Sequence, residues 1–416
     1  LKITPHHKLR MGGYIKRGKK AAGVLDDLYA RACVLKQDEQ ILVLILLDLL
    51  AVDRELTASI VEALSTPEES WKVIICCTHT HSGPDILNGD CGAVNEYRSF
   101  LKKRVVACCR EAAAELENFG EIKLFYGERE TEHIAASRLA PEQVIDRSCR
   151  LLAFRDTGSS EDLGYLANYA CHPTILGPDN LFYSGDLFGR AMRMVESDFR
   201  TTCILTNGAE GDVSTRFTRK NQKPGEADRL AKLLAGSIEE CINGADLLSV
   251  RGPVCRTKEV KLPRRDPTTS GDIEAAIEVG RVELRKLQSS AEVPAGKIRE
   301  RESRLEGLKQ RLEEDTSGAE TVKVRLMGIL IGNIIFIGVP GELTQESAVK
   351  IIQNSPPGIE IIFLGLANNY LGYFPTQKLI SRGSYEALVS RFDDRATANL
   401  EDSIGRLIEE IREEGV

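Results

Sequence analysis

Three stretches of this chain follow one plan, in which two apolar segments joined by a short polar turn lead directly to a polar side chain. The paired segments are Ala30–Lys36 with Ile41–Leu47, Arg150–Phe154 with Gly164–Ala170, and Thr321–Leu330 with Ile334–Val339. The residues that follow them are Asp48, His172 and Glu342. Two apolar runs separated by a short polar turn are typical of a β-hairpin. We therefore expect sheets built largely from hairpins, with reactive side chains where strands leave the core.

Single strand-like runs and helical segments alternate with these hairpins. The single runs are Lys72–Cys77, Thr202–Leu205 and Glu360–Leu364, and they lead toward His79, Asn207 and the segment Asn368–Tyr373. Helical periodicity covers Glu55–Leu64, Ala93–Glu117, Leu187–Phe199, Gly225–Ile242, Leu343–Asn354 and Glu401–Glu413. This alternation predicts an α/β fold with mixed β-sheets flanked by helices. Active sites of open sheets gather outside the strand carboxyl ends, so the polar clusters predict one shared site.

The length of 416 residues fits a single catalytic domain spanning residues 1–416. Within it, residues 268–318 are rich in charge and contain two helical patterns, Gly271–Gln288 and Lys297–Asp315. A break at Val293–Gly296 separates these patterns and predicts an inserted helical hairpin. A solvated arm, a lid over the site and a dimer contact all remain open as its role.

Composition narrows the class of protein. Hydrophobic residues make up 42% and charged residues 28% of the chain, which is typical of a globular protein with a large core. The net charge of −7 argues against a nucleic-acid partner, which clustered Lys and Arg would favour. The longest apolar run, Ile41–Val52, contains Asp48 and is too short to span a bilayer, so no transmembrane segment is expected.

The cysteines and the first residues of the chain indicate in which cellular compartment the protein is expected. The 11 cysteines form an odd number, contain no Cys-x-x-Cys pair and lie mostly in hydrophobic runs. Buried free thiols are typical of a reducing compartment. The start Leu1–Pro5 lacks the pattern of a secretion signal. We therefore expect a cytoplasmic protein.

Three of the chain's 6 histidines lie in two short patches, Thr78–Pro84 and Cys171–Thr174. His79 and His81 are two apart, so on an extended segment both side chains would face the same way. Such a pair can chelate a metal or supply one ligand and one proton donor or acceptor. Hydrogen-bonded loop histidines, and a helix-start role for Glu342, are the structural alternatives. Two histidines and a carboxylate at separate strand ends would leave a coordination position for water.

Two other catalytic patterns are not met. The polar turn Asn207–Ser214 contains glycines but lacks the phosphate-binding pattern GxxxxGK[ST]. Ser214 does not sit in a GxSxG nucleophile elbow. A phosphate-cradling loop and a serine hydrolase are thus disfavoured.

Taken together, these patches resemble the catalytic domain of the neutral/alkaline (non-lysosomal) ceramidase family. The matching stretches, in the family's order, are His79–Pro84, Asn168–Thr174, Ser184–Asp186, Asn207–Ser214, Pro340–Glu342 and Gly365 through Tyr373 to Tyr385–Glu386. The resemblance implies a ceramidase-like fold and a zinc amidase that cleaves an N-acyl amine.

The resemblance also implies roles for individual residues. His79, His172, Glu342 and Tyr373 correspond to the zinc ligands of the family. His81 would hold the attacking water or the substrate carbonyl, and Tyr385 would help stabilise the oxyanion. Arg138, in Ala136–Leu139, matches an arginine that faces the substrate, although less closely.

The residues and the resemblance together predict a zinc-dependent hydrolase acting on the amide of a small or lipid-like N-acyl substrate. A metal-dependent esterase or lactonase using the same site is one alternative. A non-catalytic metal-binding protein that keeps the fold is another. Ceramide itself is not favoured as the substrate, and a homo-oligomer is left open.

Overall fold

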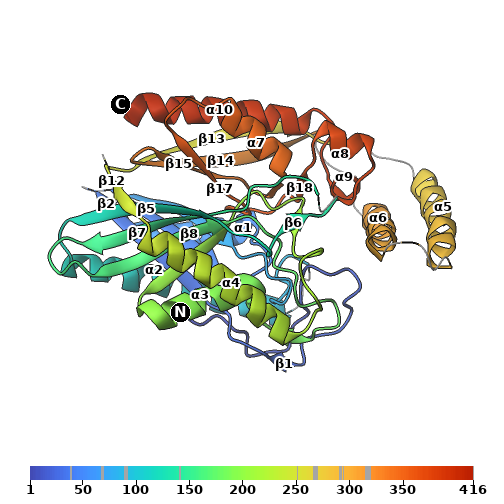
Figure 1. Ribbon diagram of the computed structural model, residues 1–416, viewed down its shortest axis with the longest axis horizontal. Helices are drawn as coiled ribbons and strands as arrows, with labels where there is room; N and C mark the ends of the chain where they lie inside the picture. The colour runs from blue at the N-terminus through green and yellow to red at the C-terminus, as the bar shows by residue number, and fades with distance from the viewer. Residues whose placement is uncertain are drawn as a thin grey trace.

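The computed structural model describes residues 1–37, 40–66, 70–88, 92–139, 142–250, 252–265, 270–289, 293, 295–313 and 320–415. Strands in these residues form three larger sheets and three two-stranded ribbons. Figure 1 shows two helices covering the upper sheet, further helices on the lower part of the molecule, and a helical pair at one edge.

The first sheet has the order β2-β3-β4. Strand β2 (Ala30–Gln37) is antiparallel to β3 (Gln40–Leu47), and β3 is parallel to β4 (Ser70–Cys77). Helix α1 (Arg54–Leu64) connects β3 to β4. Its N-cap Asp53 accepts a hydrogen bond from the backbone N–H of Leu56, which fixes where the helix begins.

The second sheet has the order β10-β8-β7-β5-β12. Its strands are β5 (Ile122–Glu130), β7 (Ser148–Asp156), β8 (Asp162–Tyr169), β10 (Thr202–Asn207) and β12 (Asp246–Leu248). Strands β7 and β8 form a hairpin, and β10 runs parallel to β8. The helices that follow β8 and β10 are α3 (Asp186–Phe199) and α4 (Pro224–Asn243).

The third sheet has the order β13-β14-β15-β17. Its strands are β13 (Val254–Pro263), β14 (Thr321–Ile331), β15 (Ile334–Gly338) and β17 (Glu360–Leu364). The helices packed with it are α7 (Gln345–Gln353) and α10 (Ala396–Gly415). Figure 1 shows α10 lying across this sheet at the top of the molecule.

All three sheets contain the same ββαβ unit. A hairpin is followed by a helix (α1, α3 or α7) and then by a strand parallel to the second hairpin strand. The three predicted hairpins are thus confirmed, and each single strand-like run is the parallel strand of the same unit. The second and fourth segments of every unit end on the same side, which brings their polar successors together.

The remaining elements are short or peripheral. The helices are α2 (Gly92–Glu115), the 3₁₀ turn η1 (Leu116–Asn118), α8 (Gln377–Ser381) and α9 (Tyr385–Val389). The ribbons pair β1 (Gly23–Val24) with β9 (Phe182–Tyr183), β6 (Ala136–Ser137) with β11 (Val213–Ser214), and β16 (Glu342–Leu343) with β18 (Tyr373–Phe374). These two-residue strands were not predicted, because distant parts of the chain define them.

A shared hydrophobic core holds the sheets together. The largest buried cluster contains residues of all three sheets, among them Leu44, Leu152 and Phe336. Two further clusters join the first sheet to α1 and α2, and the third sheet to α7 and α10. Among helices of the described residues, none combines the length and apolar character needed to cross a membrane.

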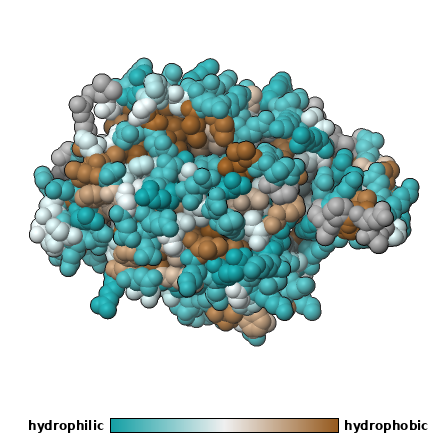
Figure 2. All heavy atoms as spheres, in the orientation of Figure 1, coloured by the Kyte–Doolittle hydropathy of each residue, from teal (hydrophilic) through white to brown (hydrophobic). Residues whose placement is uncertain are grey.

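The predicted insertion contains two helices, α5 (Ser270–Gln288) and α6 (Ala295–Glu313). They pack on each other through a small apolar cluster of their own, which includes Ile277 and Leu305. Figure 1 shows the pair at the edge of the molecule beside α8 and α9, and Figure 2 shows mainly hydrophilic atoms there. Of the predicted insertion 268–318, residues 268, 269, 290–292, 294 and 314–318 lie outside the described residues, and they include part of the predicted break at Val293–Gly296. The assignment of 1–416 as one catalytic domain stays a prediction.

A substitution at Gly341 tests how closely the backbone before β16 approaches the backbone before β18. A Cβ atom there would lie 2.4 Å from the carbonyl oxygen of Gly372 and 2.8 Å from Phe374 Cε2. We expect Gly341→Ala to destabilise the fold by about 1–3 kcal/mol, because this backbone contact cannot open without a shift. Gly236→Ala is the control: this glycine of α4 has open space, and alanine should stabilise the helix by about 0.5–1 kcal/mol. Thermal unfolding of both variants measures the difference, and a Gly341→Ala variant as stable as wild type would contradict this packing.

Candidate metal centre

His79 and His81 follow the carboxyl end of β4. His79 has a left-handed backbone with φ of 65°, so the prediction of an extended His79–His81 segment is wrong. The turn still brings the two rings together, with centroids 5.0 Å apart. The Nδ1 of His79 lies 2.9 Å from the carbonyl oxygen of Leu50, which fixes this nitrogen as the donor. Its Nε2 is therefore the atom with a free lone pair.

His172 follows β8 and is held in the same way. Its Nδ1 lies 2.8 Å from the carbonyl oxygen of Glu210 and 3.1 Å from that of Val213. A ring nitrogen that donates to a backbone carbonyl leaves the other nitrogen available as a metal ligand. The sequence signal, a histidine directly after a strand, thus corresponds to an oriented side chain.

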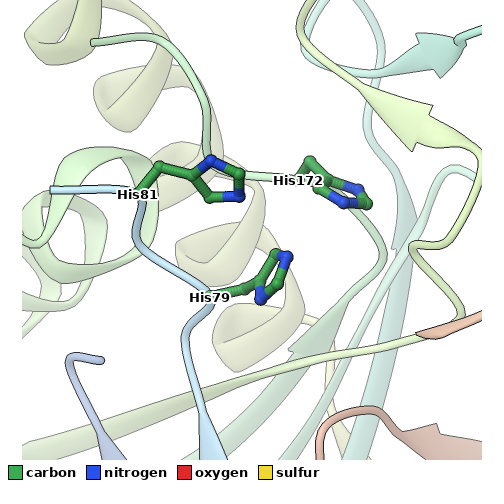
Figure 3. Close-up of side chains that lie close together, drawn as sticks. All are labelled: His79, His81 and His172. Carbon is green, nitrogen blue, oxygen red and sulfur yellow. The ribbon is translucent and has the colours of Figure 1, made fainter. Parts of the chain in front are cut away.

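The three histidines form one buried cluster. One nitrogen atom from each of His79, His81 and His172 lies within 4.8 Å of the others, which is a group that could hold a metal ion. Figure 3 shows the three rings converging, with His79 and His81 on one loop and His172 on another segment. The prediction that the two histidine patches come together at strand ends is thus confirmed.

His81 differs from the other two in its hydrogen bonding. Neither ring nitrogen has a hydrogen-bond partner among the described residues, although the ring is buried. Burial lowers the pKa of His81 well below its usual value, and His79 and His172 lower it further. A neutral imidazole with two unpaired nitrogens can act as a metal ligand or transfer a proton to a bound molecule.

Glu342 adds a carboxylate to the cluster. Its side chain is fully buried, with Oε2 lying 2.8 Å from Nε2 of His172 and Oε1 lying 3.7 Å from Nε2 of His79. The hydroxyl of Tyr370 donates a 2.7 Å hydrogen bond to Oε1. Burial alone would raise the pKa of Glu342, but His79, His172 and Tyr370 together lower it to about 2. The carboxylate is therefore ionised at neutral pH.

The protonation states suit a divalent metal. Burial lowers the pKa of His79 to about 4, against the opposing effect of Glu342, so this imidazole is neutral at pH 7. Metal ligands must be neutral imidazoles and ionised carboxylates. His79 and Glu342 meet this requirement. Nε2 of His172 lies 2.8 Å from Glu342 Oε2, and the unpaired nitrogens of His81 border the same space. The residues fit a metal ion, whose identity the donor set does not fix.

Tyr373, Arg138 and Tyr385 lie beside this cluster. The hydroxyl of Tyr373 is 3.3 Å from Nε2 of His172 and accepts a 3.3 Å hydrogen bond from Arg138. The pairing of β16 with β18 places Tyr373 opposite Glu342. The Arg138 guanidinium also lies over the ring of Tyr385, 5.6 Å from its centroid. All seven residues singled out in the sequence are thus brought together, while their individual roles stay predictions.

Two neighbours of the cluster were not assigned to the site from the sequence. Tyr370 lies three residues before Tyr373 in the same loop, a spacing that could have indicated it. Glu210 is fully buried, and neither carboxyl oxygen has a hydrogen-bond partner among the described residues. Burial and the charge of Glu342 raise the pKa of Glu210 well above its usual value. This shift opposes ionisation of Glu210, whereas the neighbours of Glu342 favour its ionisation.

The cluster opens into a cavity of about 750 Å³. The three histidines, Glu342, Tyr370, Tyr373, Tyr385 and Arg138 all line it. Residues of α6, including Arg299 and Glu306, form part of its wall. The inserted hairpin therefore contacts the site rather than projecting only into solvent.

Comparison with known proteins relates both the sequence and the fold of this chain to ceramidases. Residues 3–108 match the family model described as neutral/alkaline non-lysosomal ceramidase, N-terminal. The described chain has the mixed α/β fold of ceramidases, so the resemblance seen in the sequence is confirmed.

Two solved structures are similar over nearly the whole chain. One is described as ceramidase complexed with C2, with a TM-score of 0.78, 18% identity, and coverage of 99% of this chain and 74% of that one. The other is neutral ceramidase from Pseudomonas aeruginosa, with a TM-score of 0.75, 19% identity and the same coverages. At these identities the likeness establishes the fold alone. Among curated proteins, none matches this chain by sequence.

Tyr370 provides a test of the metal centre. Tyr370→Phe removes the hydrogen bond that holds Glu342 Oε1, and loss of such a bond to a ligand costs about 10- to 100-fold in metal affinity. Chelator competition measures this affinity. Tyr97→Phe is the control, because its hydroxyl binds the Ile3 carbonyl far from the site. Equal affinities in Tyr370→Phe and wild type would contradict a metal centre in which this hydrogen bond holds Glu342 as a ligand.

Proposed function

We propose that this protein is a zinc-dependent amidohydrolase that cleaves the amide bond of an N-acyl amine. The observation that carries this proposal is the buried cluster of His79, His81 and His172 beside the ionised Glu342. The ceramidase-like fold supports an amide as the bond cleaved. The cavity over the cluster provides room for a substrate.

His79, His172 and Glu342 would hold the zinc, with the Tyr373 hydroxyl as a further ligand. Zinc accepts imidazole nitrogens and carboxylate oxygens, and a catalytic site keeps a position open. When bound, zinc supplies Lewis-acid chemistry, which polarises a carbonyl and lowers the pKa of water.

The surrounding side chains provide proton transfer and positive charge. His81 is neutral and unpaired, so its ring can accept a proton from water and return it to the departing amine. Burial raises the pKa of Tyr385 to about 12, against the opposing effect of Arg138, so its hydroxyl remains a donor for a developing oxyanion. Arg138 keeps its charge and holds Tyr373.

The same site could act on an ester or lactone, since the carbonyl chemistry is shared. We also propose a reducing, cytoplasmic setting, which the ten free cysteines of the described residues support. A homo-oligomer stays open.

His81→Ala separates catalysis from metal binding. We expect this variant to keep its zinc and to lose about 10²- to 10⁴-fold in kcat, the contribution typical of general acid–base catalysis. Hydrolysis of a panel of N-acyl amines and esters, with and without chelator, and metal analysis of the same samples give both readouts.

The control is His7→Ala, which removes an exposed imidazole that lies 3.3 Å from Glu96 Oε1. It should match wild type in turnover and zinc content. Loss of zinc from His81→Ala would make His81 a ligand instead. A wild-type protein that binds no metal and cleaves none of the panel would refute the proposed function.

A further inference from the structure

The cavity over the metal centre carries an excess of positive charge. Eight arginine and lysine side chains line it, against four carboxylates. One of these carboxylates is Glu342, which already faces the histidines. A neutral amide with long apolar chains needs apolar walls, whereas this lining is rich in guanidinium groups.

Arg216 and Arg219 supply the most distinctive part of this charge. Both lie just after β11, whose residue Ser214 bridges to His172. Arg216 Nη1 donates a 3.4 Å hydrogen bond to the carbonyl oxygen of Arg138. Arg219 Nη1 donates to the carbonyl oxygen of Thr174 at 2.8 Å. Neither guanidinium forms an ion pair with a carboxylate among the described residues.

Three other arginines with little exposure to water are paired with carboxylates. Arg31 binds Glu196 and Asp48, and Arg150 binds three carboxylates. Arg190 lies between Asp26 and Asp228. Arg17, which lines the same cavity, forms no ion pair among the described residues either, but its three guanidinium nitrogens donate to four backbone carbonyl oxygens. Arg216 and Arg219 have neither the acids of the first three arginines nor the full set of carbonyl partners of Arg17.

The electrostatics of the pair agree with this geometry. Burial lowers the pKa of Arg216 to about 9, Arg138 and Arg299 lower it further, and Glu386 opposes only part of this effect. Burial also lowers the pKa of Arg219, against the opposing effects of Tyr14 and Asp186. Cations that are shielded from water without an anionic partner are costly, and an anion entering the cavity would offset that cost.

We propose that Arg216 and Arg219 bind an anionic oxygen group, a carboxylate or a phosphate, carried by the substrate. The substrate is then a negatively charged N-acyl amine rather than a neutral lipid amide. A guanidinium offers a planar pair of donors that matches both kinds of anion. This inference rests on the proposed function, since it names the substrate class of the same site.

The test compares amides of equal acyl length and different charge. The panel contains an N-acyl ethanolamine, an N-acyl glycine, an N-acyl phosphoethanolamine and a succinyl amide. We expect wild type to prefer at least one of the anionic amides over the neutral one. In Arg216→Gln and Arg219→Gln, the ratio of kcat/KM for that amide to kcat/KM for the neutral one should fall about 10- to 100-fold, as expected for a charged hydrogen bond. The preferred member identifies the anion and the side of the amide that carries it.

Arg412→Gln is the matched control, since it removes one positive charge from an exposed site on α10. It should keep the wild-type ratio. Arg216→Lys and Arg219→Lys keep the positive charge and can be tested if a glutamine variant does not fold. These lysine variants should lose less selectivity for the anionic amide than the glutamine variants.

Calorimetry on chelator-treated protein separates this inference from the proposed function. Inorganic phosphate or N-acyl glycine should bind wild type and bind Arg216→Gln and Arg219→Gln more weakly, even if no amide is hydrolysed. Hydrolysis of the neutral amide as fast as all the anionic ones would overturn the inference while leaving the amidohydrolase in place. Unchanged selectivity in both arginine variants would overturn it as well.

Discussion

The buried charge of Glu342 is the constraint on which the arrangement of the site depends. An ionised carboxylate without access to water is costly unless hydrogen bonds and opposite or ligating groups surround it. The Tyr370 hydroxyl donates a hydrogen bond to Oε1. Oε2 has no hydrogen-bond donor among the described residues, because Nε2 of His79 and Nε2 of His172, which face the carboxylate from other parts of the chain, carry lone pairs. Burial and the charge of Glu342 raise the pKa of Glu210, which opposes a second negative charge beside Glu342. A metal ion among these groups would remove the remaining cost of the charge.

The three ββαβ units bring those parts of the chain together, and asparagines at or after the ends of their parallel strands hold the ends in place. Asn207 is the last residue of β10 and forms two hydrogen bonds with the backbone of Cys171, next to His172. Asn368 follows β17 and exchanges two hydrogen bonds with Ile75 in β4, on the strand that leads to His79. Backbone geometry at the strand ends is therefore tied between units, which limits how far the histidines can move.

The sequence predicts what depends on local patterns. The hairpins and most helices could be located because apolar periodicity and turns are short-range signals. The left-handed turn at His79 and the pairing of Glu342 with Tyr373 could not, since contacts with distant residues impose them. The position of α6 in the cavity wall also depends on contacts with distant residues, so the sequence alone leaves the role of the inserted hairpin open. Tyr373, Tyr385 and Arg138 entered through the family resemblance, and their position near the histidines agrees with it while their roles stay predictions.

The two proposals concern one cavity: a metal ion held by His79, His172 and Glu342 would activate an amide, and Arg216 and Arg219 would select a charged substrate. The first proposal is central, because without the metal the histidines would have no common task. Diffraction from crystals of zinc-loaded protein, recorded above and below the zinc absorption edge, tests it most directly. The account predicts one anomalous peak about 2.0–2.2 Å from Nε2 of His79, Nε2 of His172 and a carboxylate oxygen of Glu342. No peak there, or a peak held by other residues, would contradict it.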